Sequence, residues 1–281
     1  MGLIDPVAVE PAADVGGVHF IAIGGAGMSG IAAAYCDLGV AVSGSDRSDS
    51  ATLRELADKG IETFVGHSAD QLGDARTVVV SSAIPETNPE LVEARRRGLR
   101  IWHRSAALAG LMVGRVGVAV TGTHGKTTTT GMIASMLVAA GHDPGYVIGS
   151  PLSATGRSSH LGTASPFVVE ADESDGSFMQ YPARVAVVTN VEADHLDNWG
   201  TPERYRQGFV AFGSQPDVEH LVVSADDPGS RAVAAAVREA GKRVLTFGES
   251  EDADVRISGA SHDGSRAQAE LSASGESVPL R

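Results

Sequence analysis

Residues 116–130 read VGVAVTGTHGKTTTT, and this stretch decides the class of fold. An apolar run with the length of a buried strand, Val116–Val120, leads directly into a glycine loop and then into a helical pattern. In such a loop the backbone amides wrap phosphate groups, the lysine reaches the β- and γ-phosphates, and a hydroxyl after it holds Mg²⁺. We therefore expect a phosphate site formed by Gly122, Thr123, His124, Gly125, Lys126, Thr127 and Thr128.

The loop departs from the strict phosphate-loop pattern, which requires a glycine where Val120 stands. The Gly-Lys-Thr core and the strand–loop–helix context are nevertheless present. Lysine is rare here, since Lys59, Lys126 and Lys242 are the only lysines among 22 basic residues. In a chain that otherwise uses arginine, a lysine at this place indicates a need for a compact charge. The alternative is a glycine- and threonine-rich helix start without a ligand.

Acidic clusters follow the next two apolar runs. The first run, Phe167–Glu170, ends in a carboxylate and is followed by three more, which makes four within residues 168–175. The second run, Val185–Thr189, precedes another acidic segment that contains His195. Ligands of open α/β sheets bind outside the carboxyl ends of strands, and Mg²⁺ prefers carboxylate and phosphate oxygens. We expect Glu170 to be the main metal ligand, Glu173 the second, and His195 a ligand or polar contact. The alternative for the acids is a solvated loop.

Another glycine loop, which is the first along the chain, lies near the N-terminus; residues 122–130 form the second glycine loop. Residues 25–30 fit G-x-G-x-x-G between a predicted strand, Val18–Ile23, and a predicted helix, Ser29–Leu38. Asp46 follows at the end of the next strand, where a ribose-binding acid belongs. The pattern predicts a nucleotide-diphosphate site without identifying NAD, and a tight turn without a ligand is the alternative. The expected contacts are Gly25, Ala26, Gly27, Met28, Ser29 and Asp46.

Short apolar runs alternate with helical patterns along the whole chain, which predicts right-handed βαβ units and a mostly parallel sheet. The pattern restarts after residue 112. We therefore expect an α/β fold with an N-terminal Rossmann-like parallel-sheet domain over 1–112 and a P-loop-type α/β domain over 113–281. Further strands are expected at 40–43, 77–81, 100–102, 221–224 and 244–247, helices at 51–59, 89–97, 126–140, 202–212 and 228–240, and a hairpin at 254–258 and 268–271.

Composition limits the classes of partner. The 281 residues are 42% hydrophobic and 20% charged, as in ordinary globular proteins. A formal charge of −13 argues against nucleic acid or an anionic membrane as the main partner. The lone Cys36 cannot form an intrachain disulfide, residues 1–17 do not resemble a signal peptide, and no apolar run could span a membrane. A cytoplasmic protein is expected.

Taken together, these motifs resemble those of the Mur ligases, the ATP-dependent amide-forming enzymes of peptidoglycan synthesis. The likeness is greatest to the branch that joins L-alanine to UDP-N-acetylmuramate. The matching stretches are HFIAIGGAGMSGIA (19–32), SGSD (43–46), SSAIP (81–85), GTHGKTTTT (122–130), VEADESDGSF (169–178) and TNVEADHLD (189–197).

The resemblance implies a three-domain enzyme that uses ATP and Mg²⁺. ATP phosphorylates the lactyl carboxylate of UDP-N-acetylmuramate, and the amine of L-alanine then attacks the acyl phosphate. Lys126 would span the β- and γ-phosphates, Thr127 and Glu170 would hold a first Mg²⁺, and His195 a second. The first glycine loop would take the UDP diphosphate. By position, His67 and Ser82 would contact the UDP-sugar.

Two departures bear on this expectation. Later enzymes of the family place a carbamoylated lysine at the second metal site, but no lysine lies between Lys126 and Lys242, which fits the alanine-adding branch. We expect the family's third domain to be absent from these 281 residues, and we therefore expect this chain alone to bind nucleotide weakly and not to turn over. The alternatives are an NAD-dependent oxidoreductase, a non-catalytic nucleotide-binding module, and the related ligase that recycles whole peptides onto UDP-N-acetylmuramate.

Overall fold

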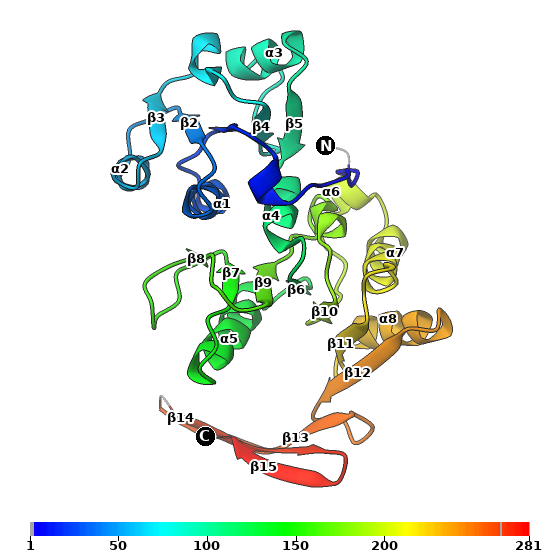
Figure 1. Ribbon diagram of the computed structural model, residues 1–281. Helices are drawn as coiled ribbons and strands as arrows, with labels where there is room; N and C mark the ends of the chain where they lie inside the picture. The colour runs from blue at the N-terminus through cyan, green and yellow to red at the C-terminus, as the bar shows by residue number, and fades with distance from the viewer. Residues whose placement is uncertain (1–2, 265, 281) are drawn as a thin grey trace.

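A computed structural model describes residues 3–264 and 266–280. The chain forms two α/β units, each built on its own sheet (Figure 1). The first sheet is entirely parallel, with the order β3-β2-β1-β4-β5. Its strands are β1 (Val18–Ile21), β2 (Val42–Asp46), β3 (Glu62–Val65), β4 (Thr77–Val80) and β5 (Arg100–His103). The strand order reverses between β1 and β4, and ligands of such sheets bind at this switch point.

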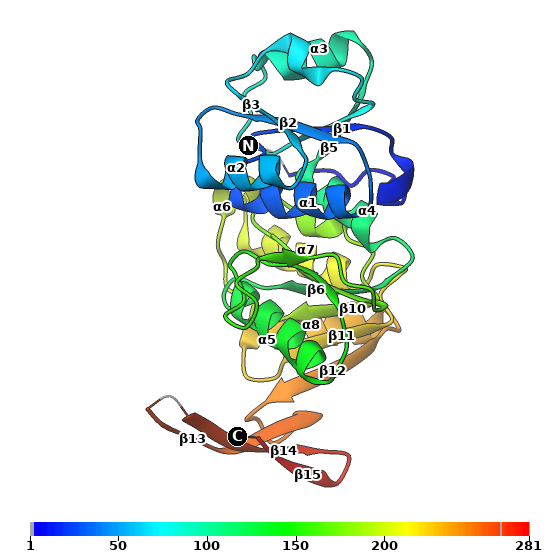
Figure 2. The ribbon, with the colours of Figure 1, turned by 60° about the vertical axis from the view of Figure 1, so that its left-hand side comes forward.

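Helices cover both faces of the first sheet. Figure 2 shows α1 (Ala26–Asp37) and α2 (Ala51–Asp58) on one side and α3 (Pro89–Arg96) on the other. The alternation along β1 explains this, because Phe20 packs with the α1 side while Ile21 packs with Leu91 of α3. Short 3₁₀ turns complete the unit at η1 (Ala12–Asp14) and η2 (Ala69–Leu72).

The second sheet has ten strands in the order β15-β14-β13-β12-β11-β10-β6-β9-β7-β8. It is parallel from β7 to β13 and antiparallel at both edges. The strands are β6 (Val116–Thr121), β7 (Gly145–Val147), β8 (Ser159–His160), β9 (Pro166–Glu170), β10 (Val185–Val188), β11 (His220–Ser224), β12 (Arg243–Gly248), β13 (Val255–Asp263), β14 (Arg266–Ala273) and β15 (Glu276–Leu280). The helical elements are α5 (Lys126–Ala139), η3 (Ser177–Gln180), α6 (Leu196–Trp199), α7 (Pro202–Gly213) and α8 (Pro228–Glu239).

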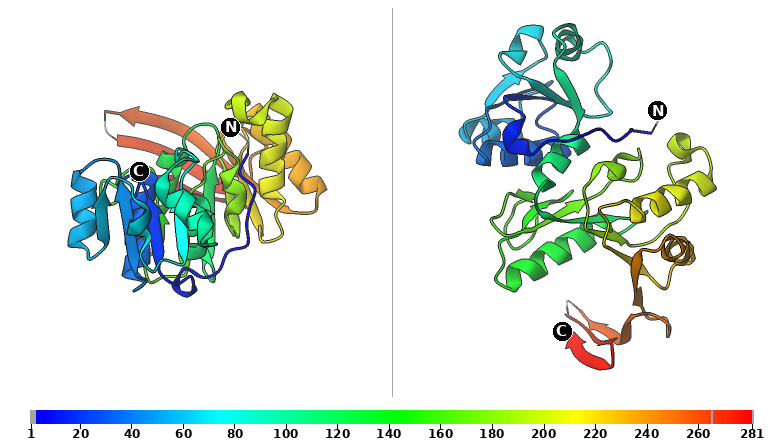
Figure 3. Two further views of the ribbon diagram at one scale, coloured as in Figure 1. Left: turned by 90° about the horizontal axis from the view of Figure 1, so that it is seen from above. Right: turned by 45° about the vertical axis from the view of Figure 1, so that its right-hand side comes forward.

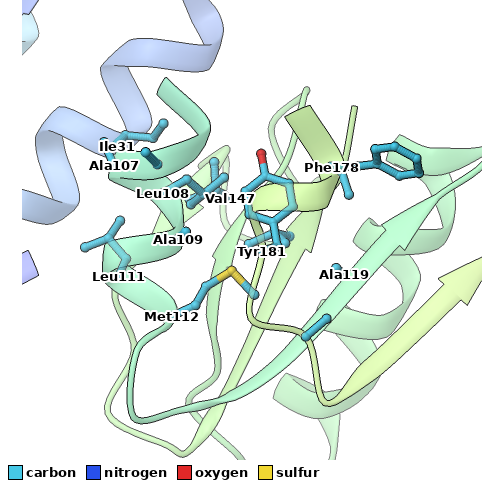
Figure 4. Packing of buried hydrophobic residues seen from close by; sticks show 14 of the residues in the cluster. Ile31, Ala107, Leu108, Ala109, Leu111, Met112, Ala119, Val147, Phe178 and Tyr181 are labelled. Carbon is cyan, nitrogen blue, oxygen red and sulfur yellow. The ribbon is translucent and has the colours of Figure 1, made fainter. Parts of the chain in front are cut away.

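Helix α4 (Arg104–Met112) joins the two units. Every residue from Ser105 to Met112 is buried, and a single hydrophobic cluster runs through α4 into both units. Figure 4 shows this packing, with Ile31 of α1 on one side of α4 and Tyr181 after η3 on the other. Because one core serves both units, their relative placement is fixed by buried apolar surface.

The N-terminal segment also crosses between the units, as the right-hand view of Figure 3 shows. The amide of Ile4 donates to the carbonyl of Asp175 at 2.8 Å, and Val7 exchanges two hydrogen bonds with the side chain of Gln180. At the opposite end, β13–β15 extend away from the helix-covered part of the sheet (Figure 1). In the part of the chain that the structure describes, no helix is both long and apolar enough to cross a membrane.

The predicted α/β class is confirmed, and the predicted hairpin near the C-terminus is present as β13 and β14. Several boundaries were wrong. Helix α1 begins at Ala26 and not at Ser29, because Gly25 serves as its N-cap and the following glycines are accommodated in the first turns. The second strand extends to Asp46, because its serines face buried polar partners. The division at residue 112 stays a prediction.

Besides the 3₁₀ turns, six elements were not predicted: β3, α4, β7, β8, α6 and β15. Helix α4 is apolar on all sides, so it shows no amphipathic period. Strand β3 lies at a sheet edge with exposed end residues, and β7 and β8 have only three and two residues. Such elements are stabilised by neighbours distant in the sequence.

Candidate nucleotide-binding site

The loop between β6 and α5 requires glycine at two positions. Gly122 has φ +134° and Gly125 has φ +82°, both in the region that side chains rarely adopt. A Cβ atom on Gly122 would lie 2.0 Å from Oγ1 of Thr189. Helix α5 begins at Lys126, and no side chain caps its N-terminus. The free amides of this turn and the helix dipole therefore form an anion site.

Lys126 is fixed over this loop. Its Nζ donates to the carbonyl of Gly122 at 2.7 Å and to that of Thr123 at 3.3 Å. The same atom lies 3.0 Å from Oε1 and 2.9 Å from Oε2 of Glu173. The Glu173 side chain is 0% exposed, whereas that of Lys126 is 18% exposed. Burial raises the pKa of Glu173, although the hydrogen bond and charge of Lys126 oppose this shift.

Thr127 and Glu170 form the neighbouring part of the site. Oγ1 of Thr127 donates to Oε1 of Glu170 at 2.8 Å, and the amide of Gly149 donates to Oε2 at 2.8 Å. A hydroxyl and a carboxylate beside a phosphate loop suit Mg²⁺, which takes few protein oxygens together with phosphates and water. Glu173 suits it less, because Lys126 occupies its carboxylate. The geometry thus favours Glu170 over Glu173 as the ligand.

His195 lies at the same edge of the sheet. It is the N-cap of α6 with φ +50°, a left-handed conformation that is uncommon for a residue other than glycine. Its Nε2 lies 3.9 Å from Oε1 of Glu173 and 3.7 Å from Oδ2 of Asp194, and its side chain is 39% exposed. Within residues 3–264 and 266–280, no group of three or more His, Cys, Asp or Glu side chains could hold a metal ion. A metal here would need phosphate oxygens as well.

Two residues that support the loop were not predicted. Oδ1 of Asn190 accepts a hydrogen bond from the amide of His124 at 2.9 Å, and Nδ2 of Asn190 donates one to the carbonyl of His124 at 2.9 Å. The hydroxyls of Tyr205 and Thr123 lie 2.9 Å apart, and burial raises the pKa of Tyr205. Asn190 lies two residues beyond the end of β10, so the argument from the carboxyl edge of the sheet could have found it. Tyr205 lies on α7 and carries no such signal.

The first glycine loop is closed by Asp46. Oδ2 of Asp46 accepts the amide of Gly24 at 3.0 Å, so this predicted ribose contact also shapes the loop. The side chain of Met28 is buried in the core, which leaves only its backbone for a ligand. A Cβ on Gly27 would lie 3.0 Å from Nη1 of Arg104.

Arg104 links this loop to the acidic cluster of the second unit, a role that was not predicted. Its Nη2 lies 3.0 Å from Oδ2 of Asp172. Burial disfavours the charged form of Asp172, but hydrogen bonds from Ser174 and the charges of Arg104 and Lys126 outweigh it and lower its pKa. An arginine at the first residue of α4 thus stands between the first glycine loop and the acidic segment that follows β9.

Ser82 and His67 lie in different surroundings. The Ser82 hydroxyl sits where the units meet, 3.2 Å from Nε2 of His103 and 3.2 Å from Oδ2 of Asp175. Burial lowers the pKa of His103 to about 4, against the charge of Asp175. His67 follows β3 at the far side of the first sheet, where Nδ1 contacts Ser45 and Glu90.

A cavity of about 630 Å³ lies between the two units. Helices α1 and α2 form one wall, and the segment 149–161 forms the other. Its lining includes Ser29 and Gly30 from the first glycine loop and Gly149, the backbone partner of Glu170. The cavity therefore adjoins both predicted sites.

The sequence matches two family profiles that together cover most of the chain. The Mur ligase family catalytic domain matches residues 17–115, and the Mur ligase middle domain matches residues 120–280. The chain belongs to the Mur ligase family. This membership accounts for both glycine loops, whereas the NAD-dependent oxidoreductase interpretation left the second loop unexplained.

Individual relatives are similar over nearly the whole of this Mur ligase chain. A UDP-N-acetylmuramate–L-alanine ligase of Cutibacterium acnes is 62% identical over 96% of this chain and 58% of its own length. One from Thermobifida fusca is 55% identical over 94% of the chain and 56% of its own length. The chain thus spans less than two thirds of these curated relatives.

Solved structures of related ligases have a similar fold. The UDP-N-acetylmuramate–alanine ligase of Thermotoga maritima has a TM-score of 0.78 at 29% identity, over 94% of this chain and 60% of that one. The UDP-N-acetylmuramate:L-alanyl-γ-D-glutamyl-meso-diaminopimelate ligase of Neisseria meningitides has a TM-score of 0.80 at 26% identity, over 94% and 86%.

Proposed function

We propose that this Mur ligase chain serves the ATP-dependent joining of L-alanine to the lactyl carboxylate of UDP-N-acetylmuramate. The observation that carries the proposal is the lysine-bearing loop with Thr127 and Glu170 in contact beside it. Similarity to the alanine ligases, up to 62% identity, supports the choice of substrates. We place the reaction in the cytoplasm, which suits the lone Cys36.

The residues around the second loop suit phosphoryl transfer to a carboxylate. This chemistry needs positioning and neutralisation of charge more than a protein nucleophile. Lys126 would neutralise the β- and γ-phosphates of ATP, and the amides of residues 122–128 would orient them. Thr127 and Glu170 would hold Mg²⁺, which supplies further charge neutralisation when bound. His195 and the less suited Glu173 are the remaining candidates for metal contacts.

The first loop would bind the UDP-sugar. The uncapped N-terminus of α1 offers backbone amides to the diphosphate, with Asp46 near the ribose and His67 and Ser82 as further contacts. Arg104 lies between this loop and the acidic cluster, so it can position the ligand relative to ATP. The lactyl carboxylate would then attack the γ-phosphate between the units, and ADP would leave. The amine of L-alanine would attack the resulting acyl phosphate, lose a proton and release inorganic phosphate as the amide forms.

The proposal can be tested in a protein of the relatives' length, in which this chain is joined to the remaining residues of the Cutibacterium acnes ligase. Phosphate release from ATP should require UDP-N-acetylmuramate and L-alanine, and Lys126→Ala should abolish it. Release without the UDP-sugar, or full activity in the Lys126→Ala variant, would contradict the assignment.

A second candidate is a ligase that attaches a whole peptide to the same UDP-sugar. The likeness to the Neisseria structure, with a TM-score of 0.80, favours it as the alternative. Both candidates predict the same nucleotide sites, so only the amine substrate separates them. Replacing L-alanine by the tripeptide L-alanyl-γ-D-glutamyl-meso-diaminopimelate in the phosphate-release assay decides between the two.

A further inference from the structure

A cluster of polar side chains is buried in the first sheet, on the face that α3 covers. Its members are His19 on β1, Ser45 on β2, Glu90 on α3, and His67 in the loop after β3. His19, Ser45 and Glu90 are 0% exposed, and the His67 side chain is 20% exposed. None of them belongs to the loop that binds phosphate or to the proposed metal ligands. A carboxylate buried between two histidines therefore needs a separate explanation.

Both carboxylate oxygens of Glu90 are engaged. Oε1 lies 3.0 Å from Nε2 of His19. Oε2 accepts a hydrogen bond from Oγ of Ser45 at 2.7 Å and also lies 2.8 Å from Nδ1 of His67. The backbone position is fixed too, because Asn88 caps α3 and accepts the amide of Glu90 at 2.9 Å. Glu90 thus sits in the first turn of a helix, where the helix dipole stabilises a negative charge.

This arrangement determines which nitrogen of His67 carries the proton. An ionised carboxylate only accepts hydrogen bonds, so the nitrogen beside it must donate. Nδ1 of His67 is that nitrogen. In the neutral imidazole the other nitrogen, Nε2, then has a free lone pair and acts as an acceptor.

The position of His67 points to what this acceptor would meet. The strand order β3-β2-β1 places His67, Asp46 and the first glycine loop at successive strand ends along one edge. Neighbouring strands are about 4.8 Å apart, a spacing that matches the succession of base, ribose and phosphate in a nucleotide. With the diphosphate at the glycine loop and the ribose near Asp46, the nucleoside end of the ligand falls at His67.

We propose that Glu90 is a positioning residue that holds His67 as the Nδ1–H tautomer, so that Nε2 accepts a hydrogen bond from the nucleoside of the UDP-sugar. This inference rests on the proposed function. The donor is either N3–H of uracil or a ribose hydroxyl. If it is N3–H, the site selects uridine over cytidine nucleotides, because N3 of cytosine has no proton.

The first test reads the tautomer directly in the 281-residue chain. Long-range ¹H–¹⁵N correlation spectra distinguish Nδ1–H from Nε2–H, and the spectrum of a His67→Gln variant identifies the signals of His67. We expect Nδ1–H in the wild type. We expect Nε2–H in Glu90→Gln, because the new amide can donate to Nδ1. A wild-type His67 in the Nε2–H form would overturn the proposal without any ligand present.

The second test measures calorimetric binding of UDP, 3-methyl-UDP, 2′-deoxy-UDP and CDP to the wild type, to Glu90→Gln and to a control, Glu86→Gln. Glu86 is exposed and pairs only with Arg95 among the described residues. In the wild type and the control, we expect UDP to bind on the order of tenfold more tightly than the analogue that lacks the donor. This ratio of affinities corresponds to the loss of one hydrogen bond. In Glu90→Gln this preference should disappear while thermal stability changes little.

The outcomes separate this inference from the proposed function. If UDP binds but all three analogues bind equally well, or if Glu90→Gln keeps the wild-type preference, the role of Glu90 and His67 is refuted and the UDP-sugar site stands. If the wild type does not bind UDP at all, the proposed function and this inference fall together.

Discussion

Removing the charge of Lys126 should destabilise the protein in a pH-dependent way. The Glu173 side chain is 0% exposed and both its oxygens lie within 3.0 Å of Nζ of Lys126. In Lys126→Met this carboxylate loses its charged partner. Breaking a buried pair on one side costs about 3–5 kcal/mol, since an uncompensated charge remains.

The pH dependence follows from the direction of the pKa shift. Burial already raises the pKa of Glu173 above its ordinary 4.5, so the native state holds this proton more tightly than the unfolded chain. Stability therefore falls as the pH rises from 4.5 through the raised pKa. Loss of Lys126 raises the pKa further and extends this window upward. Keeping the carboxyl protonated costs about 1.4 kcal/mol for each pH unit above 4.5. The loss of unfolding free energy in Lys126→Met is therefore limited to about 5 kcal/mol at pH 8 and to less than about 1 kcal/mol at pH 5.

Urea denaturation of the wild type, Lys126→Met, Glu173→Gln and the double variant at pH 5 and pH 8 measures these free energies of unfolding. The double variant should recover most of the loss seen at pH 8, because no carboxylate is left to ionise. Neither variant that lacks Lys126 should bind ATP well. A Lys126→Met variant as stable as the wild type at pH 8, or a double variant no more stable than Lys126→Met, would refute the reasoning.

Three further predictions concern other parts of the structure. Glu170→Gln should weaken ATP binding on the order of tenfold or more when Mg²⁺ is present and should change it little in EDTA. Calorimetry measures both affinities. Equal losses of affinity in the two conditions would exclude Glu170 as a metal ligand. Gly30→Ala should lower the free energy of unfolding by about 1–3 kcal/mol, because its Cβ would lie 2.9 Å from Cβ of Ser159. The matched control is Gly131→Ala in α5, whose Cβ meets only Leu152 at 3.2 Å, and helix propensity should raise its free energy of unfolding by up to about 1 kcal/mol. Equal effects in urea denaturation would contradict this contact between the units. Burial lowers the pKa of His103 to about 4, so the unfolded chain takes up this proton first, and the free energy of unfolding of the wild type should fall by up to about 3 kcal/mol as the pH falls from 6.5 to about 4. Urea denaturation at pH 7 and pH 4.5 should show a smaller pH dependence in His103→Gln. An unchanged pH dependence would exclude His103 as its source.

The local parts of both sites were predictable from the sequence. Glycines, a lysine and hydroxyls within a few residues of a strand end specify a phosphate loop without reference to the rest of the chain. The prediction that Glu170 acts at the same edge rested on a general property of parallel sheets. The structure places its Oε1 2.8 Å from Oγ1 of Thr127, 43 residues earlier in the chain.

The residues that support these loops were harder to predict. Arg104 meets Asp172 and Glu90 meets His19 only because α4 and α3 pack where they do, and no short motif records such pairs. The same holds for the difference between Glu170 and Glu173. Sequence proximity favoured both as metal ligands, but only side-chain packing shows that Lys126 occupies one of them. Long-range packing decides these roles, and periodicity does not.

The central claim is that the two glycine loops are separate sites for two different nucleotides. Calorimetric titration of UDP-N-acetylmuramate into the 281-residue chain, first alone and then with a saturating non-hydrolysable ATP analogue and Mg²⁺, tests it most directly. We predict one UDP-N-acetylmuramate bound per chain in both titrations, and one ATP analogue bound beside it. Competition between the two ligands for a single site, or no binding of UDP-N-acetylmuramate in either titration, would contradict the account.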